Sequence, residues 1–222
     1  MFKLSFTFNR KVGVAITASV LFALPLLSYA NEAPQTYSQC VVCHGDTGQG
    51  NAQLKSPALA GLSAEYITRQ LIHFSSGVRG SHDKDALGQQ MVAISKLLDL
   101  NKDVPALSAY IESLRAKEGS QETSGDLMNG SRYFQGKCGA CHGGKAEGNP
   151  AFKAPKLAGQ NIDYLRRQMN NFVSGVRGAH SKDKLGRQMA MMAKTTSGKE
   201  LEDILHYISQ QNTDQQKNAQ LK

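Results

Sequence analysis

The pentapeptide Cys-x-x-Cys-His occurs twice in this chain and contains every cysteine that the chain has. The two copies span residues 40–44 and 138–142. This spacing is the attachment signal for c-type haem, because the two thiols can add across the two vinyl groups of one porphyrin. The histidine that follows is then held beneath the iron as an axial ligand. The predicted attachment residues are Cys40, Cys43, Cys138 and Cys141, and the predicted iron ligands on this side are His44 and His142.

Paired cysteines can also form a redox dithiol, a zinc site or disulfides, but the rest of the sequence argues against these uses. A redox dithiol of the thioredoxin type would occur once, on a βαβ pattern, and no such pattern is present. Two Cys-x-x-Cys pairs can form a zinc site, but their usual separation is about 15–20 residues, whereas these pairs lie 98 residues apart. Neither use requires a histidine after each second cysteine. Zinc or disulfide use remains the minor alternative to two covalently bound haem c groups.

The N-terminus predicts export. Lys3, Arg10 and Lys11 form a basic start, residues 12–27 are mostly apolar, and Ser28-Tyr29-Ala30 offers small residues where a signal peptidase cleaves. The apolar run is shorter than the roughly 20 residues needed to cross a bilayer, so a membrane anchor is the less favoured interpretation. We therefore expect residues 1–30 to be a signal peptide and the mature chain to lie in the periplasm without a membrane span.

The net charge of the chain says little about its binding partners. The chain has a net charge of +8, and residues 1–30 contribute three basic and no acidic residues, which leaves +5 for the mature chain. No basic run is long, and export separates the protein from nucleic acid, so nucleic-acid binding is not expected. A mildly basic docking face for an acidic redox partner is compatible with these numbers.

The mature chain is a tandem repeat. Shifted by 98 residues, the first half overlays the second without gaps over about fifty positions. Matched segments include 57–61 with 155–159, 76–80 with 174–178, and the pairs Tyr66/Tyr164, Gln70/Gln168, His82/His180 and Met91/Met189. The repeat predicts two haem domains at 31–115 and 127–210, joined by a polar linker at 116–126 and followed by a polar tail at 211–222.

Apolar periodicity predicts an all-α fold without strands. Residues 67, 71 and 74 recur at helical spacing, as do residues 165, 169 and 172. Ser63 and Asn161 are the expected N-caps of these helices, and Gly77 and Gly175 are expected to end them. Ser197 and Glu200 fit a capping box before the last helix, and Pro105 suits the first turn of its counterpart. Each haem motif is expected at the end of a short first helix.

Methionine is the favoured second ligand of each iron. Met91 is the only methionine between the first motif and the linker, and it lies 47 residues after His44; Met189 lies 47 residues after His142. A thioether is a soft ligand that raises the reduction potential. Met191 and Met192 have no methionine partner in the first half. A role in the core alone is the alternative for Met91 and Met189.

Histidine is the rival ligand, because His82 and His180 also match, nine residues before each methionine. Their polar surroundings favour a solvent-exposed loop. Arg79 and Arg177 follow the helix-ending glycines and could pair with haem propionates or equally be solvated loop charges. Tyr66 and Tyr164 could pack against haem, although plain helix packing is the favoured role. His73 and His206 have no counterpart, which favours surface or packing roles.

With these residues placed, the chain resembles the dihaem cytochromes c4, a branch of the class I c-type cytochromes. The resemblance rests on the two motifs, the Pro-x-Leu-x-Gly segments, the Gly-x-Arg loops and the methionine before each terminal helix. It implies that the carbonyls of Pro57 and Pro155 accept a hydrogen bond from the proximal histidines. It also implies two facing helical domains and a periplasmic carrier that serves a respiratory chain, often donating to a terminal oxidase.

An electron carrier is the expected function, with both irons six-coordinate and no catalytic residues of the protein's own. The expected partners are redox proteins, for which a membrane-bound terminal oxidase or reductase and a quinol-oxidising complex are candidates. One alternative is a dihaem enzyme, such as a peroxidase or a sulfur-compound oxidoreductase, with one open haem. The near-equivalence of the two halves argues against that division of labour. The other alternative is an electron-wiring subunit of a larger dehydrogenase.

Overall fold

The computed structural model of the chain describes residue 3, residues 33–115 and residues 123–220. Apart from Lys3, the expected signal peptide lies outside these ranges, as does most of the expected linker. We call residues 33–115 the first repeat and residues 123–220 the second repeat. Within the described ranges, no helix is both long enough and apolar enough to cross a membrane.

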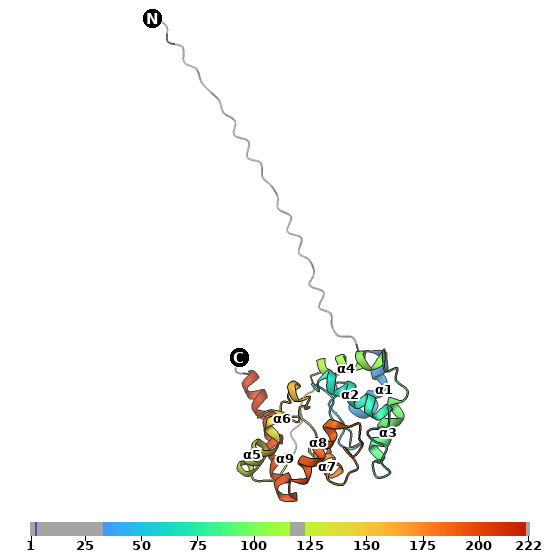
Figure 1. Cartoon of the computed structure of the whole chain (residues 1–222). Helices are drawn as coiled ribbons and strands as arrows, with labels where there is room; N and C mark the ends of the chain where they lie inside the picture. Colours follow the sequence, from blue (N-terminus) through green and yellow to red (C-terminus); the bar gives the residue numbers. More distant parts are fainter. Residues whose placement is uncertain (1–2, 4–32, 116–122, 221–222) are drawn as a thin grey trace. The chain divides into compact units, whose positions relative to one another are not determined.

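Both repeats are helical, which confirms the predicted all-α fold (Figure 1). The first repeat consists of η1 (Gln35–Tyr37), α1 (Ser38–His44), α2 (Ala64–Ser75), α3 (Ala86–Ser95) and α4 (Asp103–Ser113). The second consists of α5 (Leu127–Phe134), η2 (Gln135–Gly139), α6 (Ala140–His142), η3 (Pro150–Phe152), α7 (Ile162–Val173), α8 (Lys184–Lys194) and α9 (Gly198–Gln220). Extended pairing in the described parts is limited to the isolated bridges 51–56 and 149–154. Helix α9 continues to Gln220, through most of the segment expected to be a polar tail.

Local capping signals place the helices where the sequence predicts them. The Ser63 hydroxyl accepts a hydrogen bond from the Tyr66 amide at the start of α2, and Asn161 caps α7 in the same way. In the capping box of α9, the Ser197 amide donates to the Glu200 carboxylate at 2.8 Å and the Glu200 amide donates back to the Ser197 hydroxyl. These contacts depend on neighbours in sequence, which is why periodicity and cap residues suffice to predict them.

The repeats differ most at their N-terminal ends. In the first repeat, η1 and α1 are short, and the buried ring of Tyr37 packs edge-on against Tyr110 of α4. In the second repeat, α5, η2 and α6 follow one another without a break over residues 127–142; α5 packs across α9, and the π-helical turn η2 connects it to the haem motif. The sequence did not predict this π turn, because a single wider turn leaves no mark in apolar periodicity.

The α5–α9 crossing depends on a glycine. A Cβ atom added to Gly130 would lie 2.0 Å from the backbone carbonyl oxygen of Asp203. Because no side chain fits there, α5 can approach the backbone of α9 directly. The Asp203 carboxylate then accepts a hydrogen bond from the Asp126 amide at 2.9 Å, which holds the start of α5 against α9. The crossing thereby places the helix that leads into Cys138 and His142.

Candidate haem-binding sites

The two haem motifs present their reactive groups in equivalent ways. Cys40 and Cys43 lie one turn apart on α1, and His44 is its last residue. Cys138 lies on η2, whereas Cys141 and His142 lie on α6. All four cysteines are free thiols, so both pairs are available for thioether bonds. Each motif thus ends a helix, as the sequence predicts.

Each motif histidine has a fixed orientation. The Nδ1–H of His44 donates to the Pro57 carbonyl at 2.9 Å, and the Nδ1–H of His142 donates to the Pro155 carbonyl at 2.9 Å. These bonds agree with the role that the family resemblance implies for the two prolines. Since Nδ1 carries the proton, Nε2 of each ring has a free lone pair, which is the arrangement that a metal-binding histidine requires.

Burial also keeps these imidazoles neutral. It lowers the pKa of both His44 and His142, and this effect outweighs the hydrogen bonds to the proline carbonyls, which act in the opposite direction. A neutral imidazole is the form that binds iron. The paired thiols, the free Nε2 atoms and their protonation state therefore fit covalently bound haem in both repeats.

Two glycines that sequence reasoning passed over allow the proline segments to reach the histidines. Gly50 and Gly148 have φ values of +81° and +87°, and an added Cβ at either position would meet backbone atoms next to Pro57 or Pro155 within 3.0 Å. Their amides donate to the carbonyls of His44 and His142. The signal that could have revealed them is their matched position in the two repeats.

The two methionines occupy equivalent helices. Met91 lies on α3 and Met189 on α8, and both are partly buried. Each helix starts at an aspartate whose carboxylate accepts a hydrogen bond from a glycine amide, Gly88 or Gly186. The matched spacing in sequence thus corresponds to a matched place in each repeat.

The rival histidines lie on exposed loops. The Nδ1 atom of His82 accepts a hydrogen bond from the Lys84 amide at 3.1 Å, and that of His180 accepts one from the Lys182 amide at 3.2 Å. The side chain of His82 also lies 2.7 Å from the Asp83 carboxylate. Both imidazoles therefore interact with their own loops, as their polar surroundings predict.

Arg79 and Arg177 are not solvated loop charges, because they form a symmetric network between the repeats. The guanidinium of Arg79 donates to Gln70 of its own repeat at 2.6 Å and, in the other repeat, to the Tyr164 hydroxyl at 3.2 Å and the Gln168 carboxamide at 3.1 Å. Arg79 is buried and lies over the Phe74 ring. The network explains the repetition of Gln70 and Gln168, to which sequence reasoning assigned no role.

The second half of this network starts from Arg177 and repeats the contacts of the first half with the two repeats exchanged. Its guanidinium donates to Gln168 at 2.7 Å, to the Tyr66 hydroxyl at 3.3 Å and to Gln70 at 3.2 Å, while its buried Nε has no hydrogen-bond partner. Both arginines are thus held by neutral groups, and in the described residues neither forms an ion pair with a carboxylate. A buried cation without a counter-ion is costly, so the pair fits a site that receives anionic groups such as haem propionates.

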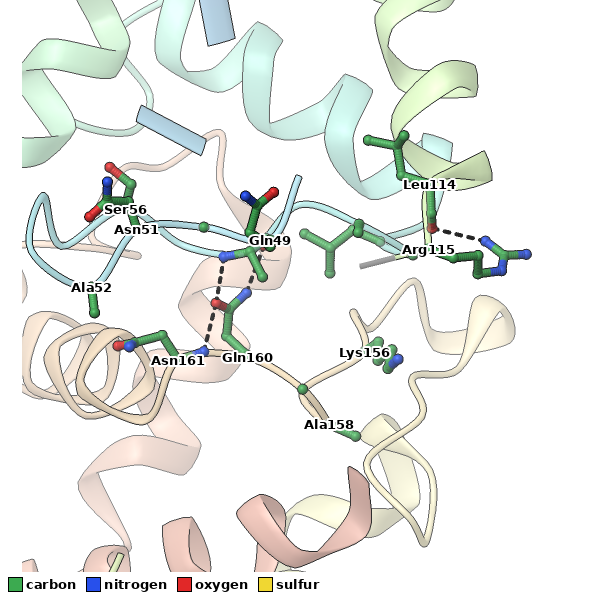
Figure 2. Close-up of a pocket in the computed structure, with 16 residues that line it drawn as sticks. Gln49, Asn51, Ala52, Ser56, Leu114, Arg115, Lys156, Ala158, Gln160 and Asn161 are labelled. Atoms are coloured by element: carbon green, nitrogen blue, oxygen red, sulfur yellow. Dashed lines mark hydrogen bonds between the residues drawn. The ribbon is translucent and has the colours of Figure 1, made fainter. Parts of the chain in front are cut away.

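Further contacts between the repeats surround this network. Arg69 donates to the Lys153 carbonyl at 2.8 Å, and its counterpart Arg167 donates to the Lys55 carbonyl at 2.7 Å. Gln160 breaks the symmetry: its carboxamide forms two hydrogen bonds with the backbone of Ala58, whereas Leu62 occupies the equivalent position in the first repeat. Figure 2 shows Gln160 and the hydrogen bonds that it forms in a pocket lined by residues of both repeats.

His73 forms a second asymmetric contact between the repeats. Its Nδ1 is buried without a hydrogen bond and lies 3.8 Å from the carboxylate of Asp183, the residue that caps α8. Burial lowers the pKa of His73; Asp183 opposes this effect, and Arg69, Arg79 and Arg177 add to it. The equivalent residue in the second repeat is Asn171, which does not titrate.

His73 should therefore make stability depend on pH. Because the folded state lowers its pKa below the ordinary value of about 6.5, the unfolded chain binds the proton more readily. The stabilisation is complete above about pH 6.5 and is lost as the pH falls below that value toward the lower folded pKa. We expect denaturant titrations of the holoprotein between pH 7.5 and 5 to show a smaller loss of stability on acidification for His73→Asn than for wild type. Equal slopes would contradict this.

Comparison with known proteins places these features in a family. Residues 30–115 and 127–212 each match the Cytochrome c family. The chain is 28% identical to a cytochrome c4 of Azotobacter vinelandii over 76% of this chain and 82% of that protein. It is 29% identical to a thiosulfate dehydrogenase electron acceptor of Thiomonas intermedia over 85% of each. The structure of Acidithiobacillus ferrooxidans cytochrome c4 superposes with a TM-score of 0.64 at 27% identity, covering 78% of this chain and 98% of that one.

These matches cover both repeats and both motifs, in agreement with the free thiols and the oriented imidazoles. They confirm two covalently bound haem c groups. Zinc binding and disulfide formation are therefore excluded as uses of the four cysteines. The chain belongs to the cytochrome c family, with two tandem cytochrome c domains of the cytochrome c4 type.

Proposed function

We propose that this protein is an electron carrier in which each repeat ligates one haem iron through a histidine and a methionine. The ligands are His44 and Met91 in the first repeat, and His142 and Met189 in the second. Cys40, Cys43, Cys138 and Cys141 hold the two porphyrins by thioether bonds. The observation that carries this proposal is the equivalence of the two sites: the same donor types come from equivalent helices, and each imidazole is oriented by a proline carbonyl at 2.9 Å.

Methionine is preferred to histidine because of where the side chains lie. Met91 and Met189 are partly buried on the helices that follow the arginine loops. His82 and His180 are exposed and interact with loop amides. Ligation by His82 or His180 would break these hydrogen bonds, whereas ligation by Met91 or Met189 requires no change in the helices that carry them.

The residues around each site suit electron transfer rather than bond chemistry. The bound haem supplies one-electron cycling of iron between the ferrous and ferric states. His44 and His142 are neutral and rigidly oriented, so little rearrangement accompanies a change of charge. Arg79 and Arg177 would compensate the propionates at the boundary between the repeats. Both repeats contribute equivalent residues to this network. The two haem sites therefore have similar surroundings, which favours the same role for both over one site specialised for binding a substrate.

For the compartment and the partners, the proposal is a periplasmic carrier released by cleavage after Ala30. It would receive electrons from a quinol-oxidising complex or another dehydrogenase and donate to a terminal oxidase or reductase. The similarity to a thiosulfate dehydrogenase electron acceptor supports a second candidate, in which the electron donor is an enzyme that oxidises sulfur compounds. This candidate keeps the same haem chemistry and changes only the donor.

Absorption and EPR spectroscopy of the purified holoprotein test the carrier function. We expect a mass increase of two haems, two low-spin ferric signals, and the red-edge charge-transfer band of a sulfur-to-iron bond. A high-spin signal from one haem in the protein as isolated would instead favour an enzyme with an open site. Loss of the sulfur band with both haems low-spin would favour ligation by His82 or His180.

A further inference from the structure

His73 brings a titratable group to the boundary between the repeats, at a place where the second repeat has an amide. It lies on α2 of the first repeat, and its Nδ1 atom is 3.8 Å from the carboxylate of Asp183 in the second repeat. The residue equivalent to His73 is Asn171, and the residue equivalent to Asp183 is Asp85. The chain therefore has a proton-binding side chain at one of two otherwise matched positions.

The Asp183 carboxylate is a buried charge without a full counter-charge. Asp183 is 6% exposed, and its carboxylate accepts a hydrogen bond from the Gly186 amide at 2.8 Å. Within residues 33–115 and 123–220, its only ion-pair partner is His73, which is charged only when it is protonated. A buried carboxylate is stabilised by a cation, and protonation makes both ring nitrogens of an imidazole hydrogen-bond donors. Binding of a proton by His73 would therefore complete this pair.

Positive charges next to His73 oppose its protonation. The charged groups that face it are Asp183 at the start of α8, Arg69 on α2, Arg79 on the loop after α2, and Arg177 on the loop after α7. Burial lowers the pKa of His73, Asp183 raises it, and the arginines lower it further. The Arg79 amide also donates to the His73 carbonyl at 3.0 Å, which holds His73 next to the arginine network. Proton binding by His73 therefore depends on the balance of charge at this boundary.

Asp183 connects this balance to the second haem, because it is the N-cap of α8. The proposed iron ligand Met189 lies six residues later on the same helix, about 9 Å along the helix axis. An electron added to the iron removes one positive charge from this region and thereby favours a cation at His73. The equivalent helix α3 starts at Asp85, and the residue that corresponds to His73 for this helix is Asn171, which binds no proton.

We propose that His73 binds a proton when the haem iron of the second repeat is reduced and releases it when that iron is oxidised; this inference rests on the proposed electron-carrier function. The ferric iron takes one electron from the donor protein and the imidazole takes one proton from solvent, so the net charge of the region stays the same. Oxidation by the acceptor reverses both steps. Because such a linkage is reciprocal, protonation of His73 raises the reduction potential of the second haem. That potential therefore falls as the pH rises.

Potentiometric titrations of the holoprotein between about pH 5 and 7.5, around the ordinary pKa of histidine, test the linkage at each haem. His73→Asn gives the first repeat the residue of the second, and Asn171→His does the reverse. Met91→Ala, which should displace only the potential of the first haem, assigns the two potentials. Haem propionates and exposed histidines occur in both repeats, so comparison of the two haems isolates the contribution of His73. His180→Asn, on an exposed loop of the second repeat, is the control.

In wild type we expect the redox equilibrium constant of the second haem to change about threefold more over this range than that of the first. This corresponds to about 30 mV, because a tenfold change corresponds to about 59 mV for one electron. His73→Asn should remove the difference, Asn171→His should give the first haem the same dependence, and His180→Asn should change neither. Equal pH dependence in wild type and His73→Asn would overturn the proposal, as would a loss at the first haem instead of the second.

NMR titration of isotope-labelled histidine in the ferric and the ferrous holoprotein is an independent measurement. The His73 signal is the one that His73→Asn removes, and its proton affinity should be about threefold higher in the ferrous protein. Identical titrations in the two redox states would contradict the linkage. If Met91→Ala displaces neither potential, the methionine ligation in the proposed function is wrong, whereas the NMR comparison still decides whether His73 responds to reduction.

Discussion

Replacement of Met189 by alanine is expected to lower the reduction potential of the second haem by on the order of 0.2 V, within the roughly 0.8 V range that axial ligands control. The thioether favours ferrous iron, so its loss favours the ferric state. The sulfur-to-iron band should lose half its intensity, and a high-spin signal should arise from one haem only. Potentiometric titration followed by absorption spectroscopy measures both effects.

The repeat provides matched controls for this experiment. Met91→Ala should produce the same change in the first haem and leave the second unchanged. Met191→Ala and Met192→Ala, on the exposed side of α8, should alter neither potential by more than a small fraction of that shift. If Met189→Ala leaves the sulfur band intact, or if Met191→Ala removes it, the ligand assignment in the second repeat is wrong.

Substitution of Gly130 by alanine is expected to destabilise the second repeat by about 2–3 kcal/mol, although alanine is the better helix former. The added methyl would lie 2.0 Å from the Asp203 carbonyl oxygen, and backbone atoms cannot rotate away. Helices α5 and α9 must therefore separate. Guanidinium titration followed by far-UV circular dichroism and by the haem absorption band would measure the loss, and Gly130→Val should cost more.

Gly136 is the matched control, because it lies in the same N-terminal segment and an added Cβ there meets no atom within 4 Å. Gly136→Ala should change the unfolding free energy by less than about 1 kcal/mol, and in the stabilising direction if it reduces the freedom of the unfolded chain. Similar losses for the two variants would mean that steric exclusion at the α5–α9 crossing is not the cause.

Much of each haem site could be predicted because its parts recur at fixed distances along the chain. The motifs define the thiols and imidazoles, and the 98-residue offset links Pro57 with Pro155 and Met91 with Met189. The structure confirms the proline contacts at 2.9 Å. The helix ends at Ser63 and Asn161 could be predicted for a related reason, since a cap and its amide are three residues apart.

The sequence by itself therefore determined the all-α class, the duplication, and the groups offered to each haem, because these depend on local spacing and on chemical type. Only the tertiary structure decided how the repeats meet. Arg79 contacts Tyr164 across 85 residues and Arg177 contacts Tyr66 across 111. The pairing of His73 with Asp183 and the direct backbone approach at Gly130 are likewise invisible in periodicity. Such contacts depend on the relative orientation of whole helices, which the packing of all their faces sets together.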